Sequence, residues 1–132
     1  MPLLYNTVLR KDPRKQDDPG KWHPVLRSIV PVNEKEVAKQ IADETTLNPK
    51  EAEMAIYQLL KVLKTQLLKG NTVQLGDWGS FFLTINSEGV ENEKDVTANQ
   101  VKQVNVHFRA GKDLRQAINE ATFKPVSTMT NK

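Results

Sequence analysis

The strongest constraint on this chain is a long amphipathic segment that runs from Asn48 to Gly70. Asn48 is a good helix cap, Pro49 suits the first helical position, and Glu51 follows where the helix dipole favours a negative charge. Gly70 is typical of a helix end. The apolar positions in between form a stripe that is wider than one packing partner requires: Ala52, Ala55, Ile56, Leu59, Leu60, Val62, Leu63, Leu67 and Leu68. This stripe predicts a helix that packs on two sides.

Two shorter helices are expected, one before this segment and one near the end of the chain. Asn33, followed by Glu36, resembles a capping box and predicts a helix that ends near Thr45. The other helix is expected from Gly111 to about Ala121, because the apolar residues of that segment recur on one face: Leu114, Ala117, Ile118 and Ala121.

Strand-like segments lie between the second and third helices. Residues 72–75 (TVQL), 80–85 (SFFLTI) and 101–108 (VKQVNVHF) are rich in residues that favour strands. Residues 86–100 are polar and predict a reversal of the chain. The expected order is therefore helix, helix, three strands and helix, which is an α+β arrangement.

Two further strand-like runs, residues 3–10 and 21–30, are joined by a turn-rich connector. Pro24 has no amide hydrogen to donate to a ladder, so the second strand should lie at an edge or carry a bulge. We expect a β-hairpin with a long basic loop. A partly disordered arm is the alternative interpretation.

The composition excludes several classes of function. The chain of 132 residues allows one domain with an appendage, and it holds no cysteine. The two histidines, His23 and His107, are far apart, so we expect strand residues with satisfied rings and no metal site. Without a nucleophile motif or a phosphate-binding glycine loop, we expect no enzyme, no cofactor and no small-molecule substrate. No apolar run suits a membrane span and no secretory signal is evident, which predicts a soluble, cytoplasmic protein.

The charge is informative through its distribution. The net charge of +3, from 19 basic and 16 acidic residues, is too small by itself to indicate a nucleic-acid binder. One basic group lies in the N-terminal hairpin and consists of Arg10, Lys11, Arg14, Lys15 and Lys21. A second group, Arg109, Lys112 and Arg115, surrounds Gly111 at the expected start of the third helix. Free amides and the helix dipole favour an anion there, although isolated charges usually form a solvated helix face.

Residues 75–83 (LGDWGSFFL) form an aromatic corner between two expected strands. Gly79 lets the backbone bend sharply and allows another group to approach closely. Strand alternation sends at least one of Phe81 and Phe82 inward, so we interpret Trp78 and one phenylalanine as core residues rather than as residues that stack on bases.

Three segments and the spacing between them resemble the HU and integration host factor family of bacterial histone-like DNA-binding proteins, over residues 33–123. "NEKEVAKQIADETTLNPKEAEMAI" resembles the two-helix opening of the family, "GNTVQLGDWGSF" its glycine corner and "VNVHFRAGKDLR" its basic return. The N-terminal hairpin and residues 79–118 are more similar to the extended HU-like branch found in Bacteroides-type bacteria.

This resemblance implies an HU-like intertwined dimer with two N-terminal helices, a three-stranded antiparallel sheet with an arm, and a short C-terminal helix. The expected domains are an N-terminal β-hairpin extension (residues 1–31), an HU-like DNA-binding domain (residues 32–124) and a flexible tail (residues 125–132). A homodimer would explain the wide apolar stripe. Its core would consist of Ile56, Leu59, Leu60, Leu63, Leu67, Trp78 and Phe81.

The implied function is largely sequence-independent binding of double-stranded DNA in the nucleoid, through phosphate and minor-groove contacts. The residues expected to contact DNA are Gly79, Ser80, Lys94, Lys102, Arg109, Gly111, Lys112 and Arg115. The basic group of the hairpin would either make a secondary DNA contact or keep a sheet edge soluble.

The chain departs from the family pattern in its arm. Residues 86–103 contain no proline and no arginine, and their four acidic residues outnumber the cations Lys94 and Lys102. Glu34 and Asp77 stand where short relatives often have lysine and glycine. These departures leave a second hypothesis open, in which the protein is an interaction scaffold that kept the fold and lost most of its DNA affinity.

Overall fold

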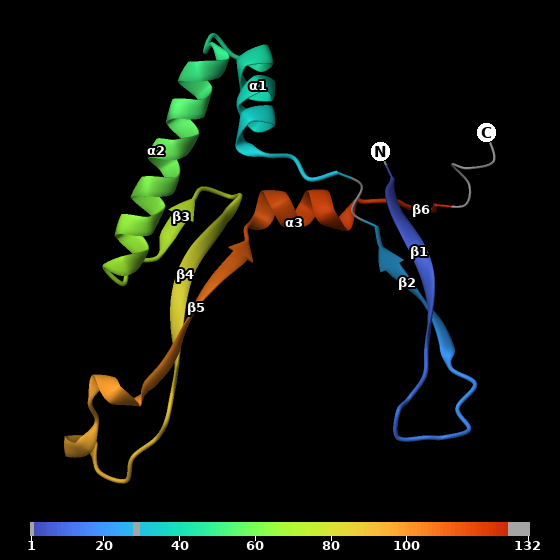
Figure 1. The fold of residues 1–132 in the computed structure, drawn as a ribbon. Helices are drawn as coiled ribbons and strands as arrows, with labels where there is room; N and C mark the ends of the chain where they lie inside the picture. Colours follow the sequence, from blue (N-terminus) through green and yellow to red (C-terminus); the bar gives the residue numbers. More distant parts are fainter. Residues whose placement is uncertain (1, 28–29, 127–132) are drawn as a thin grey trace. The chain divides into compact units, whose positions relative to one another are not determined.

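Two helices open the larger of two structural units. The computed structural model describes residues 2–27 and 30–126, and it divides into residues 33–116 and a smaller unit formed by residues 1–32 with 117–132 (Figure 1). Helices α1 (Glu34–Glu44) and α2 (Pro49–Leu68) pack side by side. The Tyr57 hydroxyl joins them by donating a hydrogen bond to a Glu34 carboxylate oxygen at 3.1 Å. A backbone hydrogen bond and then the Tyr57 hydroxyl hold the pKa of the Glu34 carboxyl below its usual value.

The helix ends confirm the predicted caps. The Asn33 side chain accepts a hydrogen bond from the Glu36 amide at 3.0 Å. Asn48 and Glu51 form a reciprocal capping box, with N···O distances of 2.8 and 3.2 Å. Gly70 follows α2 with a φ of 86°, which favours glycine over any residue with a side chain. These local contacts fix where each helix begins and ends.

The larger unit also contains an antiparallel sheet of β3 (Val73–Leu75), β4 (Gly79–Ser87) and β5 (Val101–Ala110), in the order β3-β4-β5. Strands β4 and β5 continue together as a two-stranded arm (Figure 1). The expected polar reversal at the end of the arm contains two short 3-10 turns, η1 (Glu93–Asp95) and η2 (Ala98–Gln100). The Thr97 side chain caps the second turn by accepting a hydrogen bond from the Asn99 amide.

The register of β4 and β5 gives the arm one apolar and one polar face. Directly paired residues of neighbouring strands point to the same face, and successive residues alternate. The apolar face carries Phe81, Leu83, Ile85, Val104, Val106 and Phe108, and the polar face carries Ser80, Phe82, Thr84, Gln103, Asn105, His107 and Arg109. Phe82 is the one apolar side chain among these residues of the polar face.

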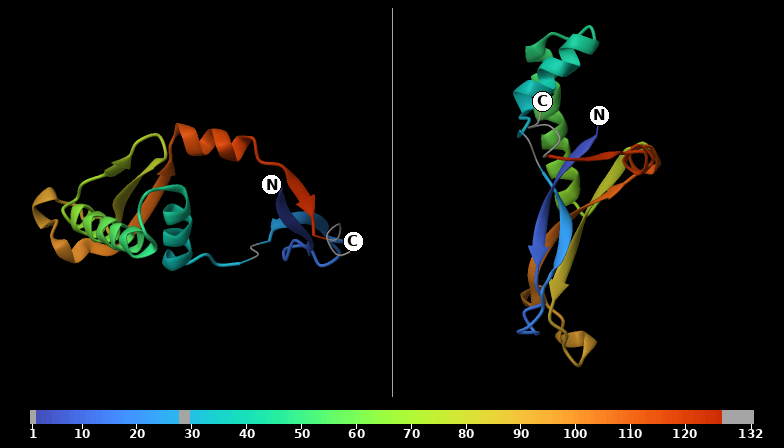
Figure 2. Two further views of the ribbon diagram at one scale, coloured as in Figure 1. Left: turned by 90° about the horizontal axis from the view of Figure 1, so that it is seen from above. Right: turned by 90° about the vertical axis from the view of Figure 1, so that its right-hand side faces the viewer.

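The smaller unit is built on the predicted hairpin. Strand β1 (Leu3–Arg10) pairs antiparallel with β2 (Lys21–Leu26), and Figure 2 shows the two running side by side. Strand β2 is an edge of the sheet, as predicted from Pro24. A third strand, β6 (Phe123–Pro125), pairs in parallel with the other side of β1. The architecture confirms the predicted α+β arrangement with its N-terminal hairpin.

Strand β6 was not expected, because no strand was predicted after the third helix; only its last residue, Pro125, falls in the predicted tail of residues 125–132. Two backbone hydrogen bonds flank it, from the Leu3 amide to the Thr122 carbonyl (2.7 Å) and from the Val126 amide to the Tyr5 carbonyl (3.1 Å). Helix α3 (Lys112–Asn119) precedes it, and the boundary between the two units falls inside this helix. Residues 127–132 of the expected tail lie outside the described residues.

The described part of the chain leaves much of its apolar surface uncovered. Its only buried apolar side chains are Leu4, Ala38 and Ala52. Along α2, the exposed fractions of Met54, Leu60 and Leu68 are 70%, 52% and 75%. Monomeric proteins rarely expose apolar residues so continuously along one element, which indicates that α2 is an interface.

Candidate nucleic-acid interface

The aromatic corner is a cluster of three rings on the apolar face of the sheet. The Trp78 and Phe108 ring centroids are 4.7 Å apart, those of Phe81 and Phe108 are 4.9 Å apart, and those of Trp78 and Phe81 are 6.1 Å apart. Tilted rings at such distances attract each other in addition to burying apolar surface. Phe81 is thus the phenylalanine that joins the cluster, whereas Phe82 lies on the opposite face.

Two glycines let the chain close this corner. A Cβ atom on Gly79 would lie 2.5 Å from the Phe108 ring and 2.7 Å from the Arg109 carbonyl oxygen. A Cβ atom on Gly111 would overlap the Asp77 carbonyl group. The group that approaches Gly79 closely within the chain is therefore the Phe108 ring. A DNA contact at Gly79 remains a prediction.

The first turn of α3 is fastened to the same corner. The Gly111 amide donates to the Trp78 carbonyl at 2.7 Å, and the Asp113 amide donates to the Asp77 carbonyl at 3.0 Å. The expectation of free amides at this helix end is wrong for these two residues, because carbonyl groups of the corner satisfy them. The side chains of Lys112 and Arg115 carry the full positive charges of this end.

Four side chains on the polar face of β4 and β5 form a continuous ladder. The Arg109 guanidinium lies over the Phe82 ring at 5.2 Å from its centroid. The Phe82 ring stacks on the His107 ring, with centroids 5.3 Å apart and an interplanar angle of 17°. The His107 Nε2 atom lies 2.7 Å from the Thr84 hydroxyl oxygen. This bond confirms the predicted strand histidine with a satisfied ring, and the ladder fixes the orientation of Arg109.

The structure brings together most of the predicted contact residues near the corner. Ser80 pairs directly with Arg109 across the two strands. The Arg115 Nε atom donates to the Ala110 carbonyl oxygen at 3.1 Å, which holds that side chain back toward the end of β5. Phe82, Thr84 and His107 were missed as supporting residues. Side chains alternate between the two faces along β4 and β5, and this pattern could have identified them as residues on the same face as Arg109.

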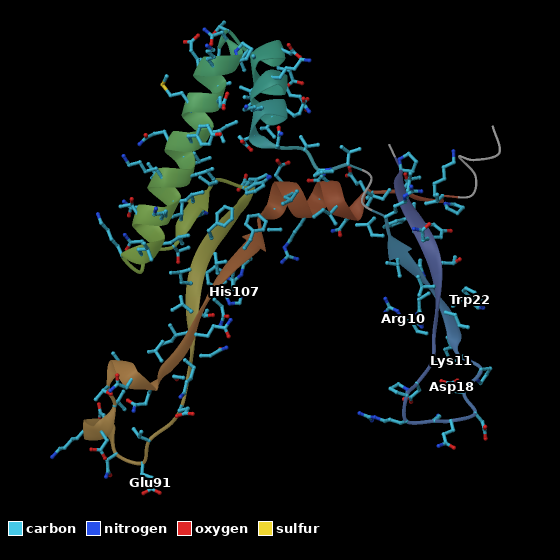
Figure 3. The ribbon with its side chains drawn as sticks, viewed as in Figure 1. Arg10, Lys11, Asp18, Trp22, Glu91 and His107 are labelled. Carbon is cyan, nitrogen blue, oxygen red and sulfur yellow. The ribbon has the colours of Figure 1, made fainter. Side chains whose placement is uncertain are left out.

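Lys94 and Lys102 belong to a separate place on the arm. Lys102 is the second residue of β5 and Arg109 is the last but one, so about 23 Å of extended strand separates them. The Lys102 ammonium forms an ion pair with Glu88 at 3.3 Å. Lys94 lies within η1 between two acidic neighbours. Figure 3 shows Glu91 at the end of the arm. Nearby carboxylates thus offset both predicted cations of the arm.

The basic group of the hairpin lies around an ordered loop. The Asp18 carboxylate accepts hydrogen bonds from the Asp12 amide at 2.8 Å and the Gly20 amide at 3.0 Å, and Asp12 accepts one from the Arg14 amide at 2.9 Å. The two bonds to Asp18 hold the pKa of its carboxyl below the usual value. The loop therefore uses two of its acidic residues to shape the backbone. Arg10 pairs across the strands with Lys21, and Lys11, Arg14 and Lys15 continue into the loop.

Membrane-spanning helices and clusters of metal-binding side chains are both absent from the described residues. None of their helices is long and apolar enough to cross a membrane. In the same residues, no group of three histidine, aspartate or glutamate side chains is placed to hold a metal ion.

Comparison with protein families and known proteins gives consistent matches. The sequence pattern of the HU-HIG family, described as an HU domain fused to a wHTH, Ig or glycine-rich motif, matches residues 1–125. The chain is 31% identical over 87 residues to the integration host factor subunit beta of Colwellia psychrerythraea, covering 64% of this chain and 92% of that protein. The corresponding subunit of Pseudoalteromonas atlantica is 31% identical over 88 residues, with the same coverage.

Two solved structures share the fold. A candidate bacterial DNA-binding protein from Bacteroides vulgatus has a TM-score of 0.65 at 16% identity and matches 94% of this chain. The match covers 48% of that protein, so this chain spans about half its length. Anabaena HU, crystallised with DNA, has a TM-score of 0.53 at 22% identity, and the match covers 67% of this chain and 98% of that one.

Proposed function

Because this chain belongs to the HU-HIG family, we propose that it is a cytoplasmic, nucleoid-associated protein that binds double-stranded DNA as a homodimer. The proposal assigns DNA binding to residues 32–124 and keeps residues 1–31 as an extension. One observation of this chain itself supports the proposal. The Arg109 guanidinium lies over the Phe82 ring on the polar face, and Arg109 pairs with Ser80. Lys112 and Arg115 follow Arg109 closely in the sequence. The crystallisation of Anabaena HU with DNA and the description of the Bacteroides vulgatus protein as a DNA-binding protein support the same class of ligand.

The proposed contacts read the DNA backbone rather than the base sequence. A guanidinium that is oriented in advance loses less conformational entropy when it binds a phosphate. The Ser80 hydroxyl can donate to a neighbouring phosphate oxygen. Because the proposed contacts are to phosphates, we infer sequence-tolerant binding that depends on phosphate contacts, the minor groove and the deformability of the duplex.

A salt series tests this function directly. The test measures the affinity of the intact chain for duplexes of one length and different sequences at several salt concentrations. The logarithm of the affinity is expected to fall linearly with the logarithm of the salt concentration, with a slope near 0.9 for each phosphate contact. Affinities for the different sequences should agree within a few-fold. If no duplex bound at about 50 mM salt, the proposal would fail and the scaffold hypothesis would replace it.

The dimer is proposed because one chain leaves an apolar groove open beside α2. This groove, of about 410 Å³, is lined by Leu59, Leu60, Leu63, Leu75, Trp78 and Phe81. Five of these six residues belong to the predicted dimer core, and Ile56 and Leu67 complete that set on α2. Side chains from a second copy would remove this surface from water, at about 25 cal/mol for each Å² of apolar area.

Light scattering checks the dimer. We expect the intact chain to have twice its single-chain mass of 15.0 kDa at micromolar concentration. Leu60→Glu should shift it toward one chain's mass, since a carboxylate would replace an apolar side chain of the groove. Gln58→Glu is the matched control, because it adds the same charge at an exposed position beside the stripe and should leave the mass unchanged. A single-chain mass for the unmodified protein would contradict the proposal.

The ion pair on the arm gives a separate test of Lys102 as a DNA contact. Glu88→Gln should raise duplex affinity by up to about fivefold in low salt, because it frees the Lys102 ammonium from an exposed pair. Glu91→Gln removes the same charge elsewhere on the arm and should have the smaller effect. Fluorescence anisotropy with a labelled duplex measures both. Equal effects would mean that Lys102 does not contact DNA.

A further inference from the structure

The polar face of β4 and β5 carries one side chain, His107, that can change its charge near neutral pH. The register pairs His107 with Phe82 and Arg109 with Ser80, so the imidazole and the guanidinium share a face. Two residues of extended strand, about 7 Å, separate His107 from Arg109. His107 is exposed, and Figure 3 shows it part-way along the arm, whose end carries Glu91. The imidazole is therefore within reach of an extended ligand that contacts Arg109.

The hydrogen bond between His107 and Thr84 changes its direction with the charge of the ring. The His107 Nε2 atom lies 2.7 Å from the Thr84 hydroxyl oxygen, and this bond does not use the Nδ1 atom. In a neutral imidazole, Nε2 can accept the hydrogen of the hydroxyl. In the cation both ring nitrogens are donors, so Nε2 must donate to the hydroxyl oxygen. Protonation thus frees the Thr84 hydroxyl to donate elsewhere and adds a full positive charge beside it.

The strands around His107 supply no negative charge to balance such a cation. Strands β3, β4 and β5 contain no acidic residue, and their other ionic side chains are those of Lys102 and Arg109. Lys102, which has a carboxylate partner, lies about 17 Å away along β5. Asp77 and Asp113 belong to the corner beyond Arg109. A positive charge on His107 would therefore lie beside that of Arg109, and a row of phosphates would balance both.

We propose that His107 and Thr84 form a further phosphate contact of the duplex site, and that His107 binds in its protonated form. The proposal rests on the proposed duplex binding. The added proton comes from water. The Nδ1–H group of His107 and the Thr84 hydroxyl then donate to phosphate oxygens. Because phosphates favour the imidazolium, the proton and the duplex strengthen each other's binding. Duplex affinity is therefore greater at pH 6 and falls as His107 loses its proton toward pH 8.

A series of pH values and salt concentrations on the intact chain tests this proposal. Duplex affinity should be on the order of tenfold higher at pH 6 than at pH 8, because each chain of the dimer gains a charge-assisted contact. The slope of log affinity against log salt should be larger at pH 6 by about 2, which corresponds to one more phosphate contact in each chain. Calorimetry at pH 7 in two buffers with different heats of ionisation should detect proton uptake on binding.

Three substitutions separate a phosphate contact from a purely structural role of the ring. His107→Gln cannot carry a charge, so it should remove most of the pH dependence and of the change in salt slope. His107→Lys is charged at both pH values and should keep the larger slope at both. Thr84→Val keeps the shape of the side chain without the hydroxyl, so it should weaken binding more at pH 6 than at pH 8. His23→Gln is the matched control and should keep the pH dependence, since His23 is the other histidine of the chain and belongs to the other structural unit.

The outcomes separate this proposal from the proposed function. Equal affinities of the unmodified chain at pH 6 and pH 8 would overturn the contact through His107 and leave duplex binding itself intact. The same conclusion would follow if His107→Gln kept the full pH dependence. An equal loss at both pH values in His107→Gln that His107→Lys did not restore would limit the ring to supporting Arg109, against the proposal. The absence of duplex binding at both pH values would overturn the proposed function together with this contact.

Discussion

Replacing Arg109 with glutamate is expected to weaken duplex binding on the order of 100-fold, since two charge-assisted hydrogen bonds per dimer at about 1.5–3 kcal/mol each would be lost. Arg109 has the most constrained orientation among the proposed contact residues, because its guanidinium lies over Phe82, and Phe82 in turn stacks on His107. The new carboxylate would also repel the phosphates. The slope of log affinity against log salt should fall by about 2 for a dimer.

A charge-matched control shows whether the position or the net charge matters. Lys50→Glu changes the charge by the same amount in the first turn of α2, the end of that helix that lies away from the sheet (Figure 1). It should weaken binding only slightly. Arg109→Lys keeps the charge and loses the planar stacking group, so an intermediate affinity is expected. Equal losses in Arg109→Glu and Lys50→Glu would show that the polar face is not the contact surface.

If the protein binds DNA as proposed, its arm would attract phosphates less than a cationic arm would. Its two lysines are offset by Glu88 and by the acidic neighbours of Lys94. Attraction to phosphate is therefore concentrated where β5 ends and α3 begins. The second basic region, around the hairpin loop, belongs to the other structural unit. Deleting residues 1–31 would measure its share of duplex affinity, but it would also remove the strand that β6 pairs with.

The parts of the fold that were predictable from sequence are those fixed by local contacts. The caps at Asn33 and Asn48 depend on residues one turn away, and Pro24 excludes a central strand by its own chemistry. Strand β6 depends on pairing between Phe123 and Leu3, which are distant in sequence and joined over only three residues. No local pattern distinguishes so short a strand from a tail.

The candidate site also contains some features that were predictable from sequence and others that were not. Ser80 and Arg109 could be identified as neighbours because the strands alternate and the return is basic. The capped amides of Gly111 and Asp113 could not be foreseen, since their acceptors are carbonyl groups of Asp77 and Trp78, whose position depends on the folded corner. Sequence patterns thus indicate which residue types gather at a site. The tertiary structure decides which of their polar groups remain available to a ligand.

The largest effect on stability is expected from Gly111→Ala. Its single added methyl group would overlap the backbone of Asp77 and approach that of Trp78, and backbone atoms cannot move aside as a flexible side chain can. The corner and the first turn of α3 would have to separate, breaking the Gly111–Trp78 and Asp113–Asp77 hydrogen bonds. Overpacking alone usually costs about 1–3 kcal/mol, and the lost bonds add to it, so we expect a loss of about 3 kcal/mol or more.

Gly89→Ala is the matched control for this substitution, because a Cβ atom there would meet no other group within 4 Å and the residue has no positive φ. Urea unfolding should show little change for Gly89→Ala and a marked loss for Gly111→Ala. Where Gly111→Ala still folds, its duplex affinity should fall as well, since the first turn of α3, with Lys112 and Arg115, would no longer be held at the end of β5. If the two alanine variants were equally stable, the close fit of α3 against the corner would be refuted. An unchanged duplex affinity would show instead that this fit positions no DNA contact.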